Sequence, residues 1–341
     1  MIPVSSNAAA GPAPMVSVLM LAYNHERYLV AALESVLMQR TSFSFEIVIG
    51  EDASTDGTRA IVQSYANRFP GMIRPLLRAS NLGTGRNYAD TLAQCRGKYI
   101  AYLEGDDQWT FPEKLQRQVE FLEAHPEHSL CFHDVAIIDD NGRETSPNFR
   151  SITAAPGALD VPDILSRNPV PTCSAMSRRS ILPSLPPEFE ALSLGDWPTW
   201  LLLAARGKVA YLPEKWAAYR VHSAAHWSTL DLGTRYLRVA DFLVVISRLL
   251  GAEPHPMARS WAQLAAAREK RHLDEVIGWL VRAGRWREAR PVARRYLSRG
   301  SLLERIPPRG RRALYFRVLL GWPSAPMREW AAELAAEKNA G

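Results

Sequence analysis

Cysteine is scarce in this sequence of 341 residues, which contains only Cys95, Cys131 and Cys173. Their number is odd and no pair has the C-x-x-C spacing, so the pattern argues against a disulfide framework or a zinc site and fits a reducing compartment. Apolar runs of about 18 residues are also missing, which predicts that no helix spans a membrane. Neither G-x-G-x-x-G nor G-x-x-x-x-G-K-[ST] occurs, which excludes a dinucleotide site of that type and a P-loop.

Charged side chains are missing from residues 1–14, which are rich in Ala, Pro, Gly and Ser. This stretch lacks the basic start and long apolar core of a signal peptide, so we expect a disordered leader. The formal net charge of +6 is uneven, because residues 254–341 carry +10 and residues 1–253 carry −4. The basic balance therefore belongs to the C-terminal part and says little about the rest of the chain.

Apolar strand-like segments alternate with segments of helical periodicity in the first part of the chain. Strands are predicted at 16–23, 45–50, 72–77 and 99–103, and helices at 27–39, at 58–68 and after 81–87. Strands that alternate with helices at this spacing imply βαβ crossovers. The sequence therefore predicts an α/β protein with a mostly parallel sheet.

The chain is organised around the strand predicted at Tyr99–Leu103 and the acidic residues that follow it. Gly105 lets the backbone turn, and Asp106 and Asp107 then present adjacent carboxylates before Pro112, a residue suited to the first turn of a helix. Ligands of open α/β sheets bind outside the carboxyl ends of the strands, and hard oxygen ligands suit Mg²⁺ or Mn²⁺. The pair is interpreted as a metal–diphosphate clamp, with a turn plus N-cap pair as the alternative.

Polar residues also end the first two strands, which places Tyr23, Asn24 and Asp52 on the same rim as Asp106 and Asp107. The carboxyl ends of parallel strands meet at one edge of a sheet. A nucleotide is the natural occupant of such a rim.

Four motifs occur in a fixed order: Ser-Val-Leu-Met-Leu-Ala-Tyr-Asn at 17–24, Glu-Asp-Ala-Ser-Thr-Asp-Gly-Thr at 51–58, Asn-Leu-Gly at 81–83 and Glu-Gly-Asp-Asp-Gln-Trp at 104–109. As an ordered set they resemble the family 2 glycosyltransferases, over about residues 15–230. The resemblance implies the GT-A fold, a nucleotide-diphospho-sugar transferase fold with a mostly parallel sheet flanked by helices. It also implies inverting, metal-dependent transfer with a DXD-like motif.

The resemblance assigns donor binding to a set of rim residues: Ala22, Tyr23, Asn24, Glu26, Asp52, Arg86, Glu104 and Asp106. Tyr23 would pack against the base, Glu26 would lie near the nucleoside, and Asp52 would accept a hydrogen bond from uracil N3–H. Asp106 would lie at the ribose and the metal, and Asp107 would bind Mn²⁺ or Mg²⁺ directly, with His222 as a further metal contact. Arg86 would approach the diphosphate, with a solvated helix residue as the alternative.

The second half of this region offers one candidate catalytic residue. Asp196 precedes Pro198 and an apolar helix predicted at Trp200–Ala205, so it is either an N-cap or a general base that takes the acceptor hydroxyl proton. A strand at 129–138, in which His133 and Asp134 are interpreted as structural, leads into a hairpin turn at 139–142. Further strands are expected at Thr172–Ser177, where relatives line the acceptor pocket, and at 209–213 and 216–222.

From about residue 232 the chain is predicted to be helical, with a tetratricopeptide-like helix pair at 272–299. The basic and apolar segment Ile306–Trp322 either lies on an anionic membrane surface or packs on the catalytic domain with its arginines in solvent. We therefore expect a leader at 1–14, a GT-A domain at 15–231 and a helical region at 232–341.

These features predict an inverting glycosyltransferase that moves a sugar from a UDP-sugar, with Mn²⁺ or Mg²⁺, to a hydroxyl of a glycan, lipid-linked or small-molecule acceptor. Asp196 would be the general base, and bacterial polysaccharide or glycoconjugate biosynthesis the setting. The alternative is a non-catalytic nucleotide-sugar-binding or scaffold protein with a helical partner-binding tail. No nucleic-acid partner is expected, and the expected location is cytoplasmic, with peripheral contact at the inner face of the membrane left open.

Overall fold

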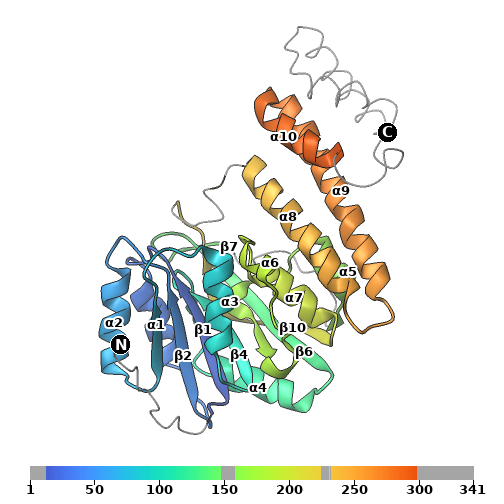
Figure 1. Ribbon diagram of the computed structural model, residues 1–341. Helices are drawn as coiled ribbons and strands as arrows, with labels where there is room; N and C mark the ends of the chain where they lie inside the picture. The colour runs from blue at the N-terminus through green and yellow to red at the C-terminus, as the bar shows by residue number, and fades with distance from the viewer. Residues whose placement is uncertain (1–12, 147–157, 224–229, 231, 298–341) are drawn as a thin grey trace, which may run out of the picture. The chain divides into compact units, whose positions relative to one another are not determined.

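The computed structural model describes residues 13–146, 158–223, 230 and 232–297 (Figure 1). The chain forms two compact units. The first comprises residues up to 228 together with 248–261, and the second comprises 229–247 and the chain from 262 onward. Apart from residues 13 and 14, the leader expected at 1–14 lies outside the described residues.

The first unit begins with alternating strands and helices, as the apolar periodicity predicts. The elements are β1 (Val16–Ala22), α1 (Leu29–Leu37), β2 (Phe45–Glu51), α2 (Thr58–Arg68), β3 (Ile73–Leu77), α3 (Thr84–Gln94) and β4 (Tyr99–Glu104). The four strands are parallel, in the spatial order β3-β2-β1-β4. Most apolar side chains of β1, β2 and β4 are buried, because helices cover the sheet on both faces, whereas β3 is only partly buried. The α/β expectation is confirmed.

The second half of the sheet is mixed, with parallel and antiparallel strands. The chain after β4 forms β5 (Gln108–Trp109), α4 (Lys114–Ala124), β6 (His128–Ile138), β7 (Glu144–Ser146), β8 (Ala158–Leu159), α5 (Val161–Ser166), β9 (Met176–Arg178), α6 (Pro187–Glu190), α7 (Asp196–Ala204) and β10 (Lys208–Arg220). The described sheet continues from β4 through β9, β6 and β10 to β5, with β7 on β6 and β8 on β10. The long strands β6 and β10 run in the direction of β1 to β4, and the short strands β5, β7, β8 and β9 run against it.

Three local expectations need correction. Pro112 lies in a turn before α4 rather than in its first turn, because the helix begins at Lys114. The segment expected as a strand at Thr172–Ser177 starts with a 3-10 turn over Thr172–Ser174, and the strand begins only at Met176. The strands expected at 209–213 and 216–222 are one strand, β10, whose pairing with β6 shifts register after Leu212.

The hairpin expected at 139–142 is confirmed. Gly142 has a φ of 77°, a left-handed conformation that glycine adopts without strain, and β6 pairs antiparallel with β7 across the turn. His133, within β6, is fully buried and packs against the Trp216 ring at 5.2 Å between centroids, as a structural residue would.

The second unit is helical in its described residues. Its helices are α8 (Leu232–Gly251), α9 (Ala258–Arg282) and α10 (Trp286–Leu297). Residues 248–261, which are the end of α8, the loop after it and the start of α9, belong to the first unit. Its core contains Ala240, Leu273, Val276, Ile277 and Leu280. The helix pair expected at 272–299 corresponds to the end of α9 and α10. The segment Ile306–Trp322 lies outside the described residues. No helix in the described part of the chain combines the length and the apolar character needed to cross a bilayer.

Candidate active site at the carboxyl ends of the strands

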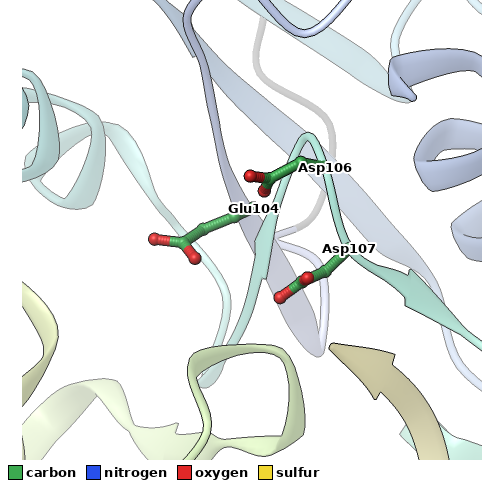
Figure 2. Close-up of side chains that lie close together, drawn as sticks. All are labelled: Glu104, Asp106 and Asp107. Carbon is green, nitrogen blue, oxygen red and sulfur yellow. The ribbon is translucent and has the colours of Figure 1, made fainter. Parts of the chain in front are cut away.

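Three carboxylates converge where β4 ends. Glu104 is the last residue of β4, and Asp106 and Asp107 lie in the turn between β4 and β5. Each offers an oxygen within 4.8 Å of the others. Figure 2 shows the three side chains projecting to the same side of this turn. The turn needs a glycine, since a Cβ on Gly105 would lie 2.8 Å from His25 Nδ1.

Two imidazoles face one oxygen of Asp106. His222 Nε2 lies 3.1 Å and His25 Nε2 lies 3.5 Å from Asp106 Oδ2. His222 is almost fully buried and its ring packs on Tyr28, with centroids 4.7 Å apart. The structure therefore brings His222 to the acidic pair, although its metal-binding role stays a prediction. It also adds His25, to which the sequence assigned no role.

Asp107 is held by the end of β10. Its Oδ1 accepts a hydrogen bond of 2.7 Å from the backbone N–H of Arg220, while its Oδ2 is buried and has no hydrogen-bond partner within the described part of the chain. An orphaned buried carboxylate oxygen beside two further carboxylates and an imidazole is a donor set that suits Mg²⁺ or Mn²⁺. The residues present therefore fit a divalent cation.

The electrostatics of the cluster follow from burial and mutual repulsion. Burial, and then the charge of Asp106, raise the pKa of Asp107 and of Glu104 well above their ordinary values. Burial also acts on Asp106, but the imidazoles of His25 and His222 outweigh it and lower the pKa of that carboxyl. Of the three carboxyl groups, Asp106 is therefore the one whose surroundings favour the ionised form.

Asp196 lies within electrostatic range of this cluster, because its charge contributes to the raised pKa of Glu104. It is the first residue of α7, and Gly195 occupies the N-cap position, so the N-cap alternative does not describe it. Asp196 Oδ2 accepts hydrogen bonds from Asn168 Nδ2 at 3.2 Å and Thr172 Oγ1 at 3.3 Å. Burial raises the pKa of Asp196, and these two hydrogen bonds act against that rise.

The ends of β1 and β2 are joined by backbone and side-chain hydrogen bonds. Ala22, the buried last residue of β1, accepts a hydrogen bond from Asp52 N at 3.0 Å. The Asn24 side chain accepts from Thr55 N at 2.9 Å, and the Glu26 carboxylate accepts from Gly57 N at 2.8 Å at the start of α2. These residues therefore build the rim that the sequence predicted.

Tyr23 and Asp52 differ in how far they are available to a ligand. Tyr23 is 42% exposed and is therefore accessible to a ligand. Asp52 is buried, and its two oxygens accept from the backbone N–H groups of Leu82 and Gly83 at 2.8 and 3.0 Å. Asp52 thus connects β2 to the Asn-Leu-Gly motif that precedes α3.

Arg86 is an exposed residue of the first turns of α3 and lies 3.9 Å from Glu190 of α6. A long, exposed ion pair of this kind contributes little to stability. The Arg86 side chain can therefore exchange Glu190 for another anion at little cost in free energy.

Sequence reasoning missed the roles of His25, Tyr28, Arg220 and Tyr219. Tyr28 donates a hydrogen bond to Asp140, and Arg220 contacts both members of the acidic pair. Burial, and then Asp107 and Glu104, raise the pKa of the Tyr219 phenol, which places it beside the same cluster. The only signal in the sequence was the Tyr-Arg-x-His spacing at 219–222, which does not reveal which carboxylate each side chain meets.

Comparison with known proteins agrees with this architecture. The family model described as glycosyl transferase family 2 matches residues 17–182. The chain is 39% identical to the uncharacterized protein Rv1520 of Mycobacterium tuberculosis over 62% of its own length and 60% of that protein. It is 30% identical to the teichuronic acid biosynthesis glycosyltransferase TuaG of Bacillus subtilis, over 61% of this chain and 79% of TuaG. The match thus spans less than two thirds of the mycobacterial relative.

Solved structures share the fold at low sequence identity. The structure of S. aureus TarS 1–349 in complex with UDP-GlcNAc has a TM-score of 0.64 and 17% identity, and covers 94% of this chain and 92% of that one. The mannosyltransferase PcManGT of Pyrobaculum calidifontis, in complex with GDP-Man and Mn²⁺, has a TM-score of 0.52 and 15% identity, with 95% and 85% covered. The expected GT-A fold is confirmed.

Proposed function

Because the chain belongs to glycosyltransferase family 2, we propose that it transfers a sugar from a UDP-sugar to an acceptor hydroxyl, with inversion at the anomeric carbon. Family membership favours a glycosyltransferase over the alternative of a non-catalytic scaffold. The observation that carries the proposal is the convergence of Glu104, Asp106 and Asp107 with Asp196 at one edge of the sheet. UDP is favoured as the carrier because the TarS structure, of the same fold, binds UDP-GlcNAc.

Asp106, Asp107 and His222 would hold the divalent cation. When bound, Mn²⁺ or Mg²⁺ supplies positive charge that neutralises the diphosphate leaving group. The protein's part is to fix the ligands: Asp107 through its hydrogen bond from Arg220 N, and Asp106 through the facing imidazoles. Mn²⁺ in the PcManGT complex supports the choice of metal.

Asp196 would take the proton of the attacking hydroxyl. An inverting displacement needs one carboxylate base on the acceptor side, within hydrogen-bond reach of the nucleophile. Asn168 and Thr172 both donate to Oδ2 of Asp196 and so fix the orientation of its carboxylate. Burial keeps the pKa of this base above that of an ordinary aspartate, which makes it a stronger proton acceptor.

The nucleoside would bind on the rim formed by β1 and β2. The exposed ring of Tyr23 offers a stacking surface for the base. Asp52 would accept from uracil N3–H with lone pairs that its two backbone donors do not use. Arg86 would approach the diphosphate after leaving Glu190.

We further propose a catalytic domain at residues 15–231, to which residues 248–261 return, and a helical region over the rest of 232–341 that contributes partner or membrane contact. The acceptor would be a glycan, a lipid-linked sugar or a small molecule of bacterial polysaccharide or glycoconjugate biosynthesis. A cytoplasmic location with peripheral contact at the inner membrane face fits such an acceptor.

Calorimetric titration tests the donor site. Full-length protein is titrated with UDP, GDP, CDP and TDP, each with and without Mn²⁺. We expect UDP to bind in a metal-dependent manner and Asp107→Ala to lose that binding, because the variant removes one of the carboxylates that fit the cation. Metal-dependent binding of GDP alone would transfer the proposal to a GDP-sugar, and no metal-dependent binding of any nucleotide would reject it.

Asp196→Asn tests the base. We expect kcat for sugar transfer to fall by about 10²–10⁴-fold, the range typical of general-base removal, with UDP–Mn²⁺ affinity unchanged. Asp163→Asn is the matched control, because Asp163 is an exposed first-turn aspartate on the neighbouring helix α5. Unchanged turnover in Asp196→Asn would refute the assignment.

A further inference from the structure

Arg220, the last residue of β10, is only 6% exposed although it carries a permanent charge. Within the described part of the chain, no carboxylate accepts a hydrogen bond from its guanidinium. The guanidinium instead donates to main-chain carbonyl oxygens: Nε to Asp106 O at 2.9 Å and Nη1 to Asp139 O at 2.8 Å. A buried arginine that donates hydrogen bonds to carbonyl groups of two separate turns holds those turns together.

Arg220 contacts both members of the acidic pair. Its backbone N–H fixes the carboxylate of Asp107 at 2.7 Å, and its Nε fixes the main chain of Asp106. One residue thus determines the orientation of a carboxylate and the position of the neighbouring backbone. Both must be correct for the two side chains to meet one cation.

The guanidinium also lies over Tyr28, the residue that precedes α1. Arg220 Cζ lies 4.8 Å from the centroid of the Tyr28 ring, over its face. The Tyr28 hydroxyl donates to Asp140 in the same turn as Asp139, and the Tyr28 ring packs on His222. Since His222 in turn faces Asp106, these contacts form a closed network around the acidic pair.

We propose that Arg220 is a positioning residue that sets the Asp106–Asp107 pair for cation binding by tying it to the turn at residues 139–142. The inference rests on the proposed function, a metal-dependent donor site. The role needs the planar fork of arginine, because its separate N–H groups reach two carbonyl oxygens while the plane covers the Tyr28 ring. A lysine keeps the charge but lacks this fork.

Manganese binding is the direct test, measured on full-length protein by calorimetry and by electron paramagnetic resonance of free Mn²⁺. We expect Arg220→Ala to raise the Kd for Mn²⁺ by about 10–100-fold, as for loss of other groups that orient metal ligands. Arg220→Lys should raise it by about tenfold or more, and is the variant to measure if Arg220→Ala does not fold. With Mn²⁺ at saturation, kcat should recover in both variants, because Asp196 and the acceptor side are untouched.

Arg178→Ala is the matched control. Arg178 also donates to main-chain carbonyls, of Leu122, His125 and His128, and lies over the ring of Tyr99, but at the opposite end of β9 and β4 from the acidic pair. We expect this variant to lower the unfolding temperature and leave the Kd for Mn²⁺ within about twofold.

The outcomes separate the two proposals. Wild-type affinity in Arg220→Lys, or equal weakening in Arg178→Ala and Arg220→Ala, would overturn the positioning role while leaving the donor site intact. Failure of the wild-type protein to bind Mn²⁺, with or without UDP, would overturn the proposed function and this inference together.

Discussion

At the scale of single residues, Asp107 combines a functional position with an electrostatic cost. Its raised pKa means that, between the unfolded value of about 3.9 and the folded value, the folded chain binds a proton that the unfolded chain has lost. Stability of the metal-free protein therefore falls as pH rises through that window. Above the window, the free energy of unfolding is lowered by the full cost of burying an ionised carboxylate with one unpaired oxygen.

We expect Asp107→Asn to stabilise the metal-free protein near neutral pH by about 1–3 kcal/mol, because it removes that charge and keeps an oxygen for the Arg220 N–H. The gain should shrink as pH is lowered and vanish below the unfolded pKa. Thermal unfolding across pH in chelator measures it. Asp90→Asn, at a partly exposed carboxylate of α3, should show no such pH-dependent gain, and a destabilised Asp107→Asn protein would contradict the prediction.

Thr172 offers a second prediction at this scale. Its hydrogen bond lowers the pKa of Asp196, so Thr172→Val should raise that pKa further. Because the base acts in its ionised form, transfer is lost as pH falls through the pKa, and the acid limb of the kcat profile should move to higher pH by about 0.5–1 pH unit.

The pH–rate profile of Thr199→Val provides the control. Thr199 is a buried residue of α7, the helix that begins at Asp196. Its hydroxyl accepts a hydrogen bond from the Tyr88 hydroxyl and donates one to Gly195 O, and it makes none to Asp196 within the described part of the chain. An acid limb that moves equally in both variants, or to lower pH in Thr172→Val, would exclude this role of Thr172.

At the scale of elements, the approach of α3 to α6 depends on one glycine. A Cβ on Gly85 would lie 2.1 Å from Leu192 O and 2.7 Å from Glu190 O, and backbone atoms cannot move aside locally. Gly85 lies near the start of α3, where alanine would otherwise favour the helix by about 1 kcal/mol. Whether Gly85→Ala raises or lowers the free energy of unfolding therefore shows how tightly α3 packs against the chain at Glu190 and Leu192.

We expect Gly85→Ala to destabilise the protein by about 1–3 kcal/mol, as overpacking does. It should also weaken UDP binding, since α3 carries Arg86 and follows the loop held by Asp52. Denaturant unfolding and calorimetry measure both effects. Gly71→Ala, in a turn with open space around it, should affect stability through its φ alone and leave UDP affinity unchanged. A more stable Gly85→Ala protein would show that α3 and α6 separate without cost.

At the scale of the whole molecule, the unit that carries the site is not one continuous stretch of chain. Residues 248–261 return to it after most of α8 has joined the second unit. Within this returning segment, Glu253 accepts two hydrogen bonds from Arg206, at 2.7 and 2.9 Å, and Trp261 is 8% exposed with His255 stacked on its ring at 4.4 Å.

We expect Trp261→Ala to lower the stability of the catalytic unit by about 3 kcal/mol, because the substitution leaves a large cavity. Differential scanning calorimetry identifies the affected transition as the one that UDP and Mn²⁺ raise. Leu264→Ala, three residues later at a 43% exposed position, should leave that transition in place. A loss confined to a ligand-insensitive transition would assign residues 248–261 to the second unit instead.

The sequence by itself determined the α/β alternation and the place of the acidic pair. Apolar periodicity is a property of contiguous residues, so it predicted β1 to β4 and the helices between them within a few residues. The rim followed from the rule that parallel strands end at one edge. Asp106 and Asp107 could be found because they are adjacent to the end of β4.

Only the tertiary structure decided what surrounds that pair. Arg220 Nε and Asp106 O are contributed by residues 114 positions apart, and His222 and Asp106 by residues 116 apart, so no local pattern encodes these contacts. The continuity of β10 was hidden by Pro213, which cannot donate to a ladder, and the register shift with β6 accommodates it. Local chemistry thus placed the carboxylates, while long-range packing set their protonation, their orientation and their partners.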